Sequence, residues 1–437
     1  MFTEREGFDK DIMLKSDFYP CQEDKSLSLL ELCCYHGAVN CFKFLRAEFN
    51  SKITETCLEL SFLGENPDIM SECLKYIEPT ASCMIMAIVS HNIDFVTFLL
   101  NEYNISIDDK LFLHYCCMHQ NLQAFLVYLH HTKSINICFV YSPSFNIPAL
   151  CAHFLSYGID VNKGEDQKGR TALHIAAKYN CKETTKFLIS NGADVDAQDC
   201  NKHITPLHLA PKYDHHQIAD ILINNGADIN IYDYFRRTAL HYTAINDNNS
   251  LKTAKILISH GINLNFRDGN GYTAVIYAVI NNHFELADLL LSSGASTDRF
   301  PHWDTILHFA ASTKSTIFTK LLIEKDSYVD KRNRDGDTPL HITAMNDSRK
   351  NAEILISSGA KVNIKNKKGQ TPLHLAIKYS SREFIKLLLT HGADINKKDK
   401  NGETALDYAL KDHNHDIIEL LNSHTTILKK FIIHNYA

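Results

Sequence analysis

The stretch TALHIAAKYNCKETTKFLISNGADVDAQD, from Thr171 to Asp199, decides the fold because its parts recur along the rest of the chain. Its opening tetrapeptide returns at intervals of 32 to 35 residues. The eight copies are TALH from Thr171, TPLH from Thr205, TALH from Thr238, TAVI from Thr273, TILH from Thr305, TPLH from Thr338, TPLH from Thr371 and TALD from Thr404. A fixed period of this length predicts a solenoid, in which each unit packs against its neighbours.

Each unit reads as a pair of helices. Thr171 can cap the first helix, and Phe187, Leu188 and Ile189 carry the apolar side of the second. Glycines that follow the second helices predict left-handed helix ends: Gly192, Gly226, Gly261, Gly294, Gly359 and Gly392. The turns between the two helices are predicted at Asn180, Asp214, Asn282, Asp347 and Ser380.

The period, the TPLH phrase and the GADIN-type phrases resemble the ankyrin-repeat family. This resemblance implies an all-α solenoid of helix-turn-helix pairs with β-hairpin fingers, and it covers residues 163–425 as eight repeats. The family pattern normally places Gly in the turn between the helices, where this chain has Asn, Asp or Ser. Asn230, Asn265, Asn363 and Asn396 resemble positions that hydroxylases modify in some ankyrin proteins, and we expect a structural hydrogen-bonding role for them.

The first part of the chain carries a weaker version of the same frame. Segments that align with ALHIAAKYNCKETTKFL begin at Leu29, Leu58, Met84, Leu113 and Phe139, and their turn residues are Gly37, Asn66, Asn92, Asn121 and Asn146. Because these turns are 25 to 29 residues apart, we expect stacked helix pairs with reduced fingers over residues 27–162. This region also resembles the divergent N-terminal part of large ankyrin families in parasitic protists. Residues 1–26 are predicted to form a leader or cap, and residues 426–437 a C-terminal capping tail.

Composition limits the class of protein. The 437 residues are 45% hydrophobic and 22% charged, without an apolar run of membrane length. The N-terminal MFTEREGFDKD lacks the apolar core of a secretory signal, so we expect a cytoplasmic protein. The 13 cysteines include no CxxC pair, and Cys33, Cys34, Cys116 and Cys117 stand where other units carry Ala. We expect these four to be small buried thiols.

The sequence contains no recognisable catalytic constellation and no GxxxxGK[ST] phosphate loop. We therefore expect no enzymatic activity, no cofactor and no small-molecule substrate. Histidine ends most copies of the tetrapeptide, at His174, His208, His241, His308, His341 and His374. We expect each imidazole to bond to the Thr hydroxyl or to neighbouring backbone and not to a metal.

Residues that vary between repeats are the candidates for partner binding. Three consecutive fingers carry the aromatic residues Tyr234, Phe235, Tyr272, Phe300 and Trp303, the last being the single Trp. Exposed aromatic side chains commonly anchor protein partners. A second interpretation remains open, in which a shortened finger folds Phe300 and Trp303 onto its neighbour.

Cationic residues form two further patterns. Equivalent places at the ends of three first helices hold Lys178-Tyr179, Lys212-Tyr213 and Lys378-Tyr379. Three successive fingers hold Lys331, Arg332 and Arg334, then Lys365, Lys367 and Lys368, then Lys397, Lys398 and Lys400. The whole chain has a net charge of −6, which is not the composition of a nucleic-acid-binding protein. These fingers are either solvated or bind an acidic protein, an anionic lipid or RNA.

The sequence thus predicts a non-catalytic scaffold that binds protein partners through finger tips and the inner-helix concave face. One alternative is a substrate adaptor for a modifying enzyme such as a ubiquitin ligase. Another is an anionic-surface binder that uses the basic fingers on lipid or RNA.

Overall fold

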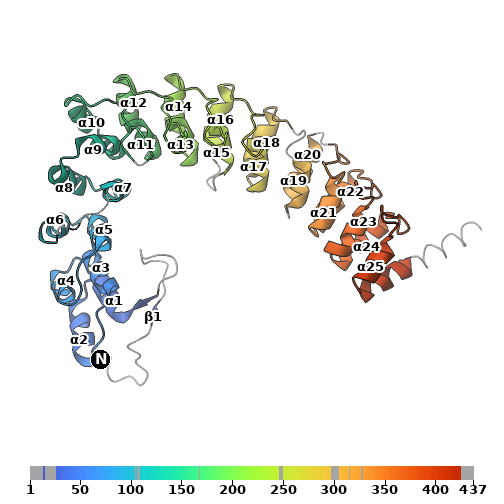
Figure 1. The fold of residues 1–437 in the computed structure, drawn as a ribbon, viewed down its shortest axis with the longest axis horizontal. Coiled ribbons are helices and arrows are strands. Elements are labelled where there is room, and N and C mark those ends of the chain that lie inside the picture. The colour runs from blue at the N-terminus through green and yellow to red at the C-terminus, as the bar shows by residue number, and fades with distance from the viewer. Residues whose placement is uncertain are drawn as a thin grey trace, which may run out of the picture. The chain divides into compact units, whose positions relative to one another are not determined.

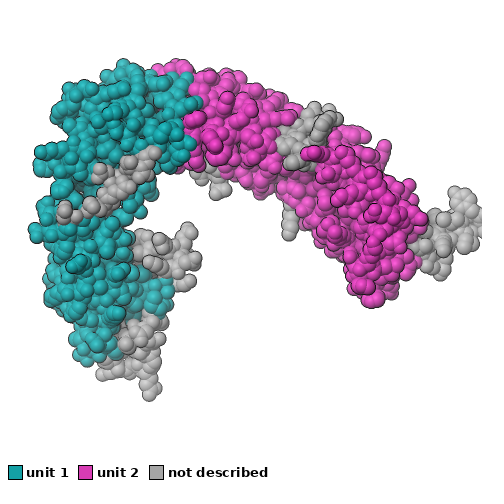
Figure 2. Space-filling view, in the orientation of Figure 1, with its two compact units in different colours: residues 1–201 teal, residues 202–437 magenta. Residues whose placement is uncertain are grey.

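A computed structural model describes residues 13–14, 26–103, 105, 109–166, 168–245, 250–296, 305–313, 315–325 and 328–424. Phe300, Trp303 and the predicted tail at residues 426–437 lie outside this set. The chain divides into two compact units, residues 1–201 and residues 202–437, which Figure 2 colours separately. Among the described residues, no helix has the length and apolar character needed to cross a bilayer.

The first unit consists of helix pairs preceded by a short strand pair (Figure 1). Its elements are β1 Met13–Leu14, β2 Leu27–Ser28, α1 Leu29–Tyr35, α2 Val39–Phe49, α3 Glu55–Leu63, α4 Pro67–Leu74, α5 Ala81–Val89, α6 Ile93–Glu102, α7 Asp109–Met118, α8 Leu122–Thr132, α9 Ile135–Tyr141, η1 Ser142–Phe145, α10 Pro148–Leu155, α11 Ala172–Lys178 and α12 Lys182–Ser190. Met13 and Leu14 pair antiparallel with Ser28 and Leu27, so part of the predicted leader joins the first helix pair as a strand.

The second unit repeats one helix pair with little variation. Its elements are α13 Pro206–Lys212, α14 His216–Asn224, α15 Ala239–Ile245, α16 Leu251–Ser259, α17 Ala274–Ile280, α18 Phe284–Ser292, α19 Ile306–Ser312, α20 Thr316–Glu324, α21 Pro339–Met345, α22 Arg349–Ser357, α23 Pro372–Tyr379, α24 Arg382–Thr390 and α25 Ala405–Lys411. Residues 415–424 are also helical. The first helices from α13 to α25 contact one another in series, and so do the second helices from α14 to α24, which gives the two rows in Figure 1.

The core runs between these rows and confirms the predicted all-α repeat architecture. In the last repeats it is built from Leu340, Leu373, Phe384 and Leu388, all almost fully buried. A single helix pair cannot bury such a face alone, so the stacking of pairs stabilises each one. Among the described residues, the isolated antiparallel bridge between Tyr232 and Thr238 is the strand-like pairing found in the fingers, which otherwise form tight turns.

The glycines and thiols lie as predicted. Each glycine after a second helix has a positive φ, such as 85° at Gly192 and 93° at Gly226. Cys33, Cys34, Cys116 and Cys117 are buried, which confirms their assignment as small core residues. Cys41 and Cys200, in contrast, are exposed.

The predicted turns between helices need correction in four places. Asn180, Asp214, Asn282 and Asp347 have the expected left-handed backbone, but Ser380 has φ of −117° because α23 continues one residue further, to Tyr379. In the first unit Gly37 and Asn146 have the left-handed backbone at their predicted turns, but Glu65, His91 and Gln120 take it in the three turns between them. The predicted Asn66, Asn92 and Asn121 follow them by one position and cap α4, α6 and α8 with their side-chain oxygens. Asn is favoured at both positions, so the sequence could not separate them.

Candidate partner-binding surface

Five fingers in the described part of the second unit each turn around one Asp or Asn side chain. In the first complete finger, Asp233 Oδ1 accepts from the backbone N–H groups of Phe235 and Arg237 at 2.9 and 2.7 Å. The Asp233 N–H donates to the Arg237 carbonyl at 2.9 Å. Equivalent side chains organise the later fingers: Asp268, Asn333, Asn366 and Asp399. Sequence reasoning missed these residues, although the recurring Asp or Asn five residues before the Thr was a usable signal.

Backbone hydrogen bonds join neighbouring finger tips. The Tyr234 N–H donates to the Lys202 carbonyl, and the Gly269 N–H donates to the Phe235 carbonyl, both at 2.8 Å. Further along, the N–H groups of Lys367 and Lys400 donate to the carbonyls of Asp335 and Lys368. These bonds hold the tips in register, so their side chains are displayed from a fixed backbone.

The histidine of the repeated tetrapeptide connects each helix start to the next finger. His241 Nδ1 accepts from the Thr238 N–H at 3.1 Å and lies 3.0 Å from its hydroxyl, and His241 Nε2 lies 3.1 Å from the Tyr272 carbonyl. Because Nδ1 accepts a backbone N–H, Nε2 carries the proton and donates. The same double contact recurs at His208, His308, His341 and His374.

The predicted role of these histidines is therefore confirmed. Burial lowers the pKa of His241 and brings that of His341 to about 4, so both rings are neutral at physiological pH. Within the described residues, no group of three or more His, Cys, Asp or Glu side chains could hold a metal ion.

Tyr-Asp bonds brace the fingers from below. The hydroxyls of Tyr242 and Tyr277 donate to the Oδ2 atoms of Asp233 and Asp268 at 2.7 and 2.6 Å. Arg237 Nη2 donates to the Tyr277 hydroxyl at 3.2 Å. Burial, followed by the bond to Asp268, raises the pKa of Tyr277. These tyrosine, aspartate and arginine side chains hold the finger in place and are not offered to a partner.

Aromatic residues gather at two adjoining fingers and form what we name the aromatic finger cluster. It comprises Tyr232, Tyr234, Phe235, Arg236 and Phe266. Tyr232 stacks on Phe266 with ring centroids 5.6 Å apart, and Tyr234 meets Phe235 edge-on at 5.4 Å. Tyr234 is 69% exposed and Phe235 is 41% exposed, so this apolar surface faces solvent.

Arg236 is the most unusual member of the cluster. Its guanidinium lies 5.7 Å from the Tyr232 ring centroid and 5.9 Å from that of Phe266. Its φ is 58°, in the left-handed region. Glycine occupies the equivalent position with positive φ in four later fingers, at Gly271, Gly336, Gly369 and Gly402, whereas His203 takes it in the preceding finger with φ of 55°. Tyr232, Phe266 and Arg236 were absent from the sequence-based site, although the missing glycine was a visible signal.

Tyr272 belongs to the neighbouring finger but has a different role. Its half-buried ring meets Tyr277 edge-on at 5.8 Å and Phe309 at 5.5 Å. The ring thus packs between a finger and two first helices, α17 and α19. Tyr272 therefore stabilises the finger surface and offers little area for a partner to contact.

The three Lys-Tyr pairs each form a cation-π contact at the end of a first helix. The Nζ atoms of Lys178, Lys212 and Lys378 lie 4.7, 5.7 and 5.0 Å from the ring centroids of the tyrosines that follow them. Tyr179 and Tyr213 are half-buried and Tyr379 is exposed. An exposed cation-π contact contributes about 0.5–1 kcal/mol, which is enough to orient these side chains.

The basic fingers place most of their cations in solvent. Arg332, Arg334, Lys365, Lys367, Lys368, Lys398 and Lys400 are exposed, whereas Lys331 and Lys397 are half-buried. Lys365 Nζ donates to the Lys398 carbonyl at 2.7 Å, and Lys397 pairs with Asp394 at 3.7 Å.

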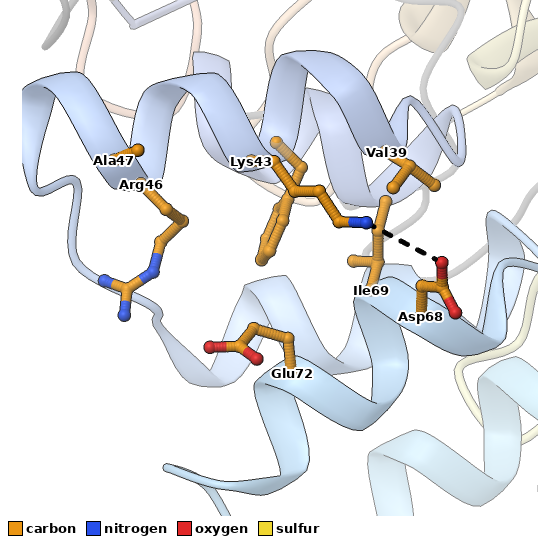
Figure 3. A pocket seen from close by; sticks show the side chains of 8 residues that line it. Val39, Lys43, Arg46, Ala47, Asp68, Ile69 and Glu72 are labelled. Carbon is orange, nitrogen blue, oxygen red and sulfur yellow. Dashed lines mark ion pairs between the residues drawn. The ribbon is translucent and has the colours of Figure 1, made fainter.

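A pocket of about 420 Å³ lies between α2 and α4 in the first unit (Figure 3). Its lining includes the apolar Phe42 and Ile69, and Lys43 and Asp68 face each other at 3.9 Å. Both of these charged side chains are more than half exposed, so their ion pair is weak. No sequence-predicted residue lines this pocket.

Comparisons with known proteins agree with the repeat architecture. A family model described as ankyrin repeats matches residues 142–233, 222–301, 296–366 and 358–430. A model described as a domain of unknown function, DUF3447, matches residues 49–128. Among solved structures, the crystal structure of the human ASB11 ankyrin repeat domain is 25% identical with a TM-score of 0.43, covering 47% of this chain and 91% of that chain. No curated protein matches the chain.

Proposed function

Because this chain belongs to the ankyrin-repeat family, whose repeats are generally protein–protein interaction modules, we propose that it is a non-catalytic scaffold. Its partner is a protein that docks on the aromatic finger cluster. The Lys212-Tyr213 pair at the end of α13, in the same unit, provides a secondary contact. Phe300 and Trp303 stay a prediction from the sequence alone, because they lie outside the described residues.

The conformation of Arg236 is the observation that carries this proposal. A non-glycine residue in the left-handed region costs on the order of 1 kcal/mol, and four later fingers avoid that cost with glycine. The arginine gains contact with two rings, but an exposed contact of this kind returns no more than the backbone costs. Retaining arginine is therefore explained better by binding than by stability, since Arg and Tyr are enriched among binding hot spots.

The test begins with the full chain as bait and continues with the purified partner. Tyr234→Ala and Arg236→Gly should each weaken the affinity for that partner by about tenfold or more, because each removes an anchor of the cluster. Arg236→Gly should at the same time leave the unfolding midpoint unchanged or raise it. This combination separates a binding residue from a structural one.

Tyr157→Ala is the matched control, because Tyr157 is 61% exposed but lies in the first unit after α10. Its affinity for the partner should equal that of the unaltered chain. If Arg236→Gly and Tyr234→Ala bind the partner as tightly as this control does, the aromatic finger cluster is not the docking surface.

The adaptor alternative predicts a different composition of the captured material. An adaptor holds its substrate and a modifying enzyme together, so a ubiquitin-ligase subunit would be retained by the Arg236→Gly bait after the substrate is lost. A scaffold that binds its one partner through the aromatic finger cluster would retain neither protein when Arg236→Gly is the bait. The scaffold role and the adaptor role therefore predict different captured proteins in the same experiment.

A further inference from the structure

We propose that the basic fingers bind an acidic, extended polypeptide segment. The proposed surface, which we name the basic finger surface, consists of exposed side chains from three successive fingers: Arg332, Arg334, Lys365, Lys367, Lys368, Lys398 and Lys400. This inference rests on the proposed protein-binding function and names the chemistry of a partner segment. It uses residues separate from the aromatic finger cluster.

Most carboxylates near these fingers are already engaged. Asp337 accepts from Asn366 Nδ2 at 2.8 Å, and Asp399 accepts from the Tyr408 hydroxyl at 3.0 Å, both from buried positions. Glu403 pairs with Lys411, and Asp330 accepts from the Lys361 N–H. Asp335 remains as an exposed carboxylate among the cations of the basic finger surface. The local charge is therefore strongly positive, although the chain as a whole carries −6.

The backbone holds these like charges close to one another. The Lys367 N–H donates to the Asp335 carbonyl at 2.8 Å, and the Lys400 N–H donates to the Lys368 carbonyl at 3.0 Å. Lys365 also reaches the next finger through the Lys398 carbonyl. Because the tips cannot separate, their cations repel, and a row of carboxylates along the fingers relieves that repulsion. An extended chain presents side chains at the regular spacing that a row of fingers can meet.

Two features favour a polypeptide over a nucleic acid. The three tips, at residues 333–337, 366–370 and 399–403, contain no aromatic side chain on which a base could stack. The net charge of −6 also repels a long polyphosphate, whereas a short acidic segment meets only the local field.

The test uses the full chain and a fluorescent, glutamate-rich synthetic peptide, with a glutamine-rich peptide of equal length for comparison. The glutamate peptide should bind at low ionic strength, and its affinity should fall by about tenfold as salt rises past the physiological range. The double variant Lys367→Glu/Lys400→Glu should weaken its binding by about tenfold or more. Lys252→Glu/Lys255→Glu, a charge-matched change on exposed positions of α16, should leave it unchanged.

Several outcomes would overturn the inference. These are equal binding by both double variants, equal binding of the glutamine peptide, or tighter binding of a single-stranded RNA of the same charge, which would make the surface a nucleic-acid site. Circular dichroism must show intact helices in every variant. Arg236→Gly should bind the glutamate peptide normally, so a failure of the aromatic finger cluster and a failure of the basic finger surface give different results.

Discussion

The two units build the same helix pair but connect successive pairs by different means. From Lys202 onward, buried histidines bond the starts of α13, α15, α19, α21 and α23 to the following finger. In the first unit, asparagine side chains cap α4, α6 and α8, and cysteines fill the tight places between helices. A hydrogen-bonded side chain restrains both the direction and the distance of its contact, whereas a packed thiol only fills volume. This difference explains why the second unit can display ordered finger tips.

The first unit retains a few directional contacts between pairs. Asn121 Nδ2 donates to the Ile88 carbonyl of α5 at 2.9 Å, while its Oδ1 caps α8 through the Ala124 N–H. Gln120 Nε2 donates to the carbonyl of Ser144 in η1 at 3.1 Å. These hydrogen bonds also join neighbouring helix pairs, as the histidine bonds do in the second unit. They begin at the turn between two helices and not at a finger.

The largest predicted loss of stability comes from removing a histidine that bonds a helix start to the next finger, a contact that we name the histidine clamp. His341 is fully buried and contacts Thr338 through Nδ1 and the Gln370 carbonyl through Nε2. His341→Ala should lower the free energy of unfolding by on the order of 3 kcal/mol, because it leaves a cavity and buried groups without partners. Urea unfolding measured by circular dichroism tests this value.

The last repeat supplies the control for the histidine clamp. Asp407 replaces the histidine there and accepts from the Thr404 N–H at 2.8 Å and from its hydroxyl at 2.7 Å. Asp407→Ala removes the cap alone and should cost about 1 kcal/mol. A cost equal to that of His341→Ala would show that the bond to the next finger adds no stability.

Asn121→Ala should have the next largest effect, about 2 kcal/mol, since the side chain is buried and makes bonds both within and between helix pairs. Asn92→Ala, which removes only the cap of α6, should cost about 1 kcal/mol. Hydrogen exchange followed by mass spectrometry should place the loss for Asn121→Ala in α5 and α8. Equal costs for the two variants would mean that the bond to Ile88 does not help join the pairs.

Alkaline pH should weaken the first unit more than the second. Burial raises the pKa of the Cys116 thiol and brings that of Cys117 to about 12. A pKa raised on folding contributes stability that is present below the unfolded pKa near 9 and is lost as pH rises toward the folded value. Between pH 8 and pH 10, unfolding free energy should fall by about 1 kcal/mol for each such thiol.

Hydrogen exchange of the full chain at both pH values, corrected for intrinsic exchange rates, tests the alkaline effect by region. The variant Cys116→Ala/Cys117→Ala places alanine where α11 carries Ala176 and Ala177, and its dependence on pH should be smaller. Residues 202–437 contain no cysteine and serve as the internal reference. An equal loss of protection in both units would contradict the thiol explanation.

The sequence predicted what depends on local patterns. The period, the Thr caps and the glycine helix ends depend on neighbouring residues, and the bonding of His241 and His341 followed from their fixed place in the repeat. The exposed Tyr234 and Phe235 could also be predicted, because they break the repeat at a finger tip. That Tyr232 and Phe266 meet around Arg236 depends on how two adjoining fingers turn, which no pattern within one repeat encodes.

Local patterns also misled at the turns. Asn66, Asn92 and Asn121 suit both a left-handed turn and a helix cap, and the structure uses them as caps. The residues that take the left-handed conformation include Glu65 and Gln120, whose side chains have no preference for it. The turns at Glu65, His91 and Gln120 therefore place more backbone strain in the first unit than the turns at Asp214, Asn282 and Asp347 place in the second.

This difference in strain predicts the smallest effect, a gain in stability that depends on the unit. His91→Gly removes an exposed side chain from a backbone with φ of 58° and should raise the free energy of unfolding by about 0.5–1 kcal/mol. Asn282→Gly, at φ of 62°, should change it by no more than a few tenths, because Asn already tolerates this conformation. Thermal unfolding of both variants measures the contrast. A larger gain at Asn282 than at His91 would mean that the first unit is not the more strained of the two.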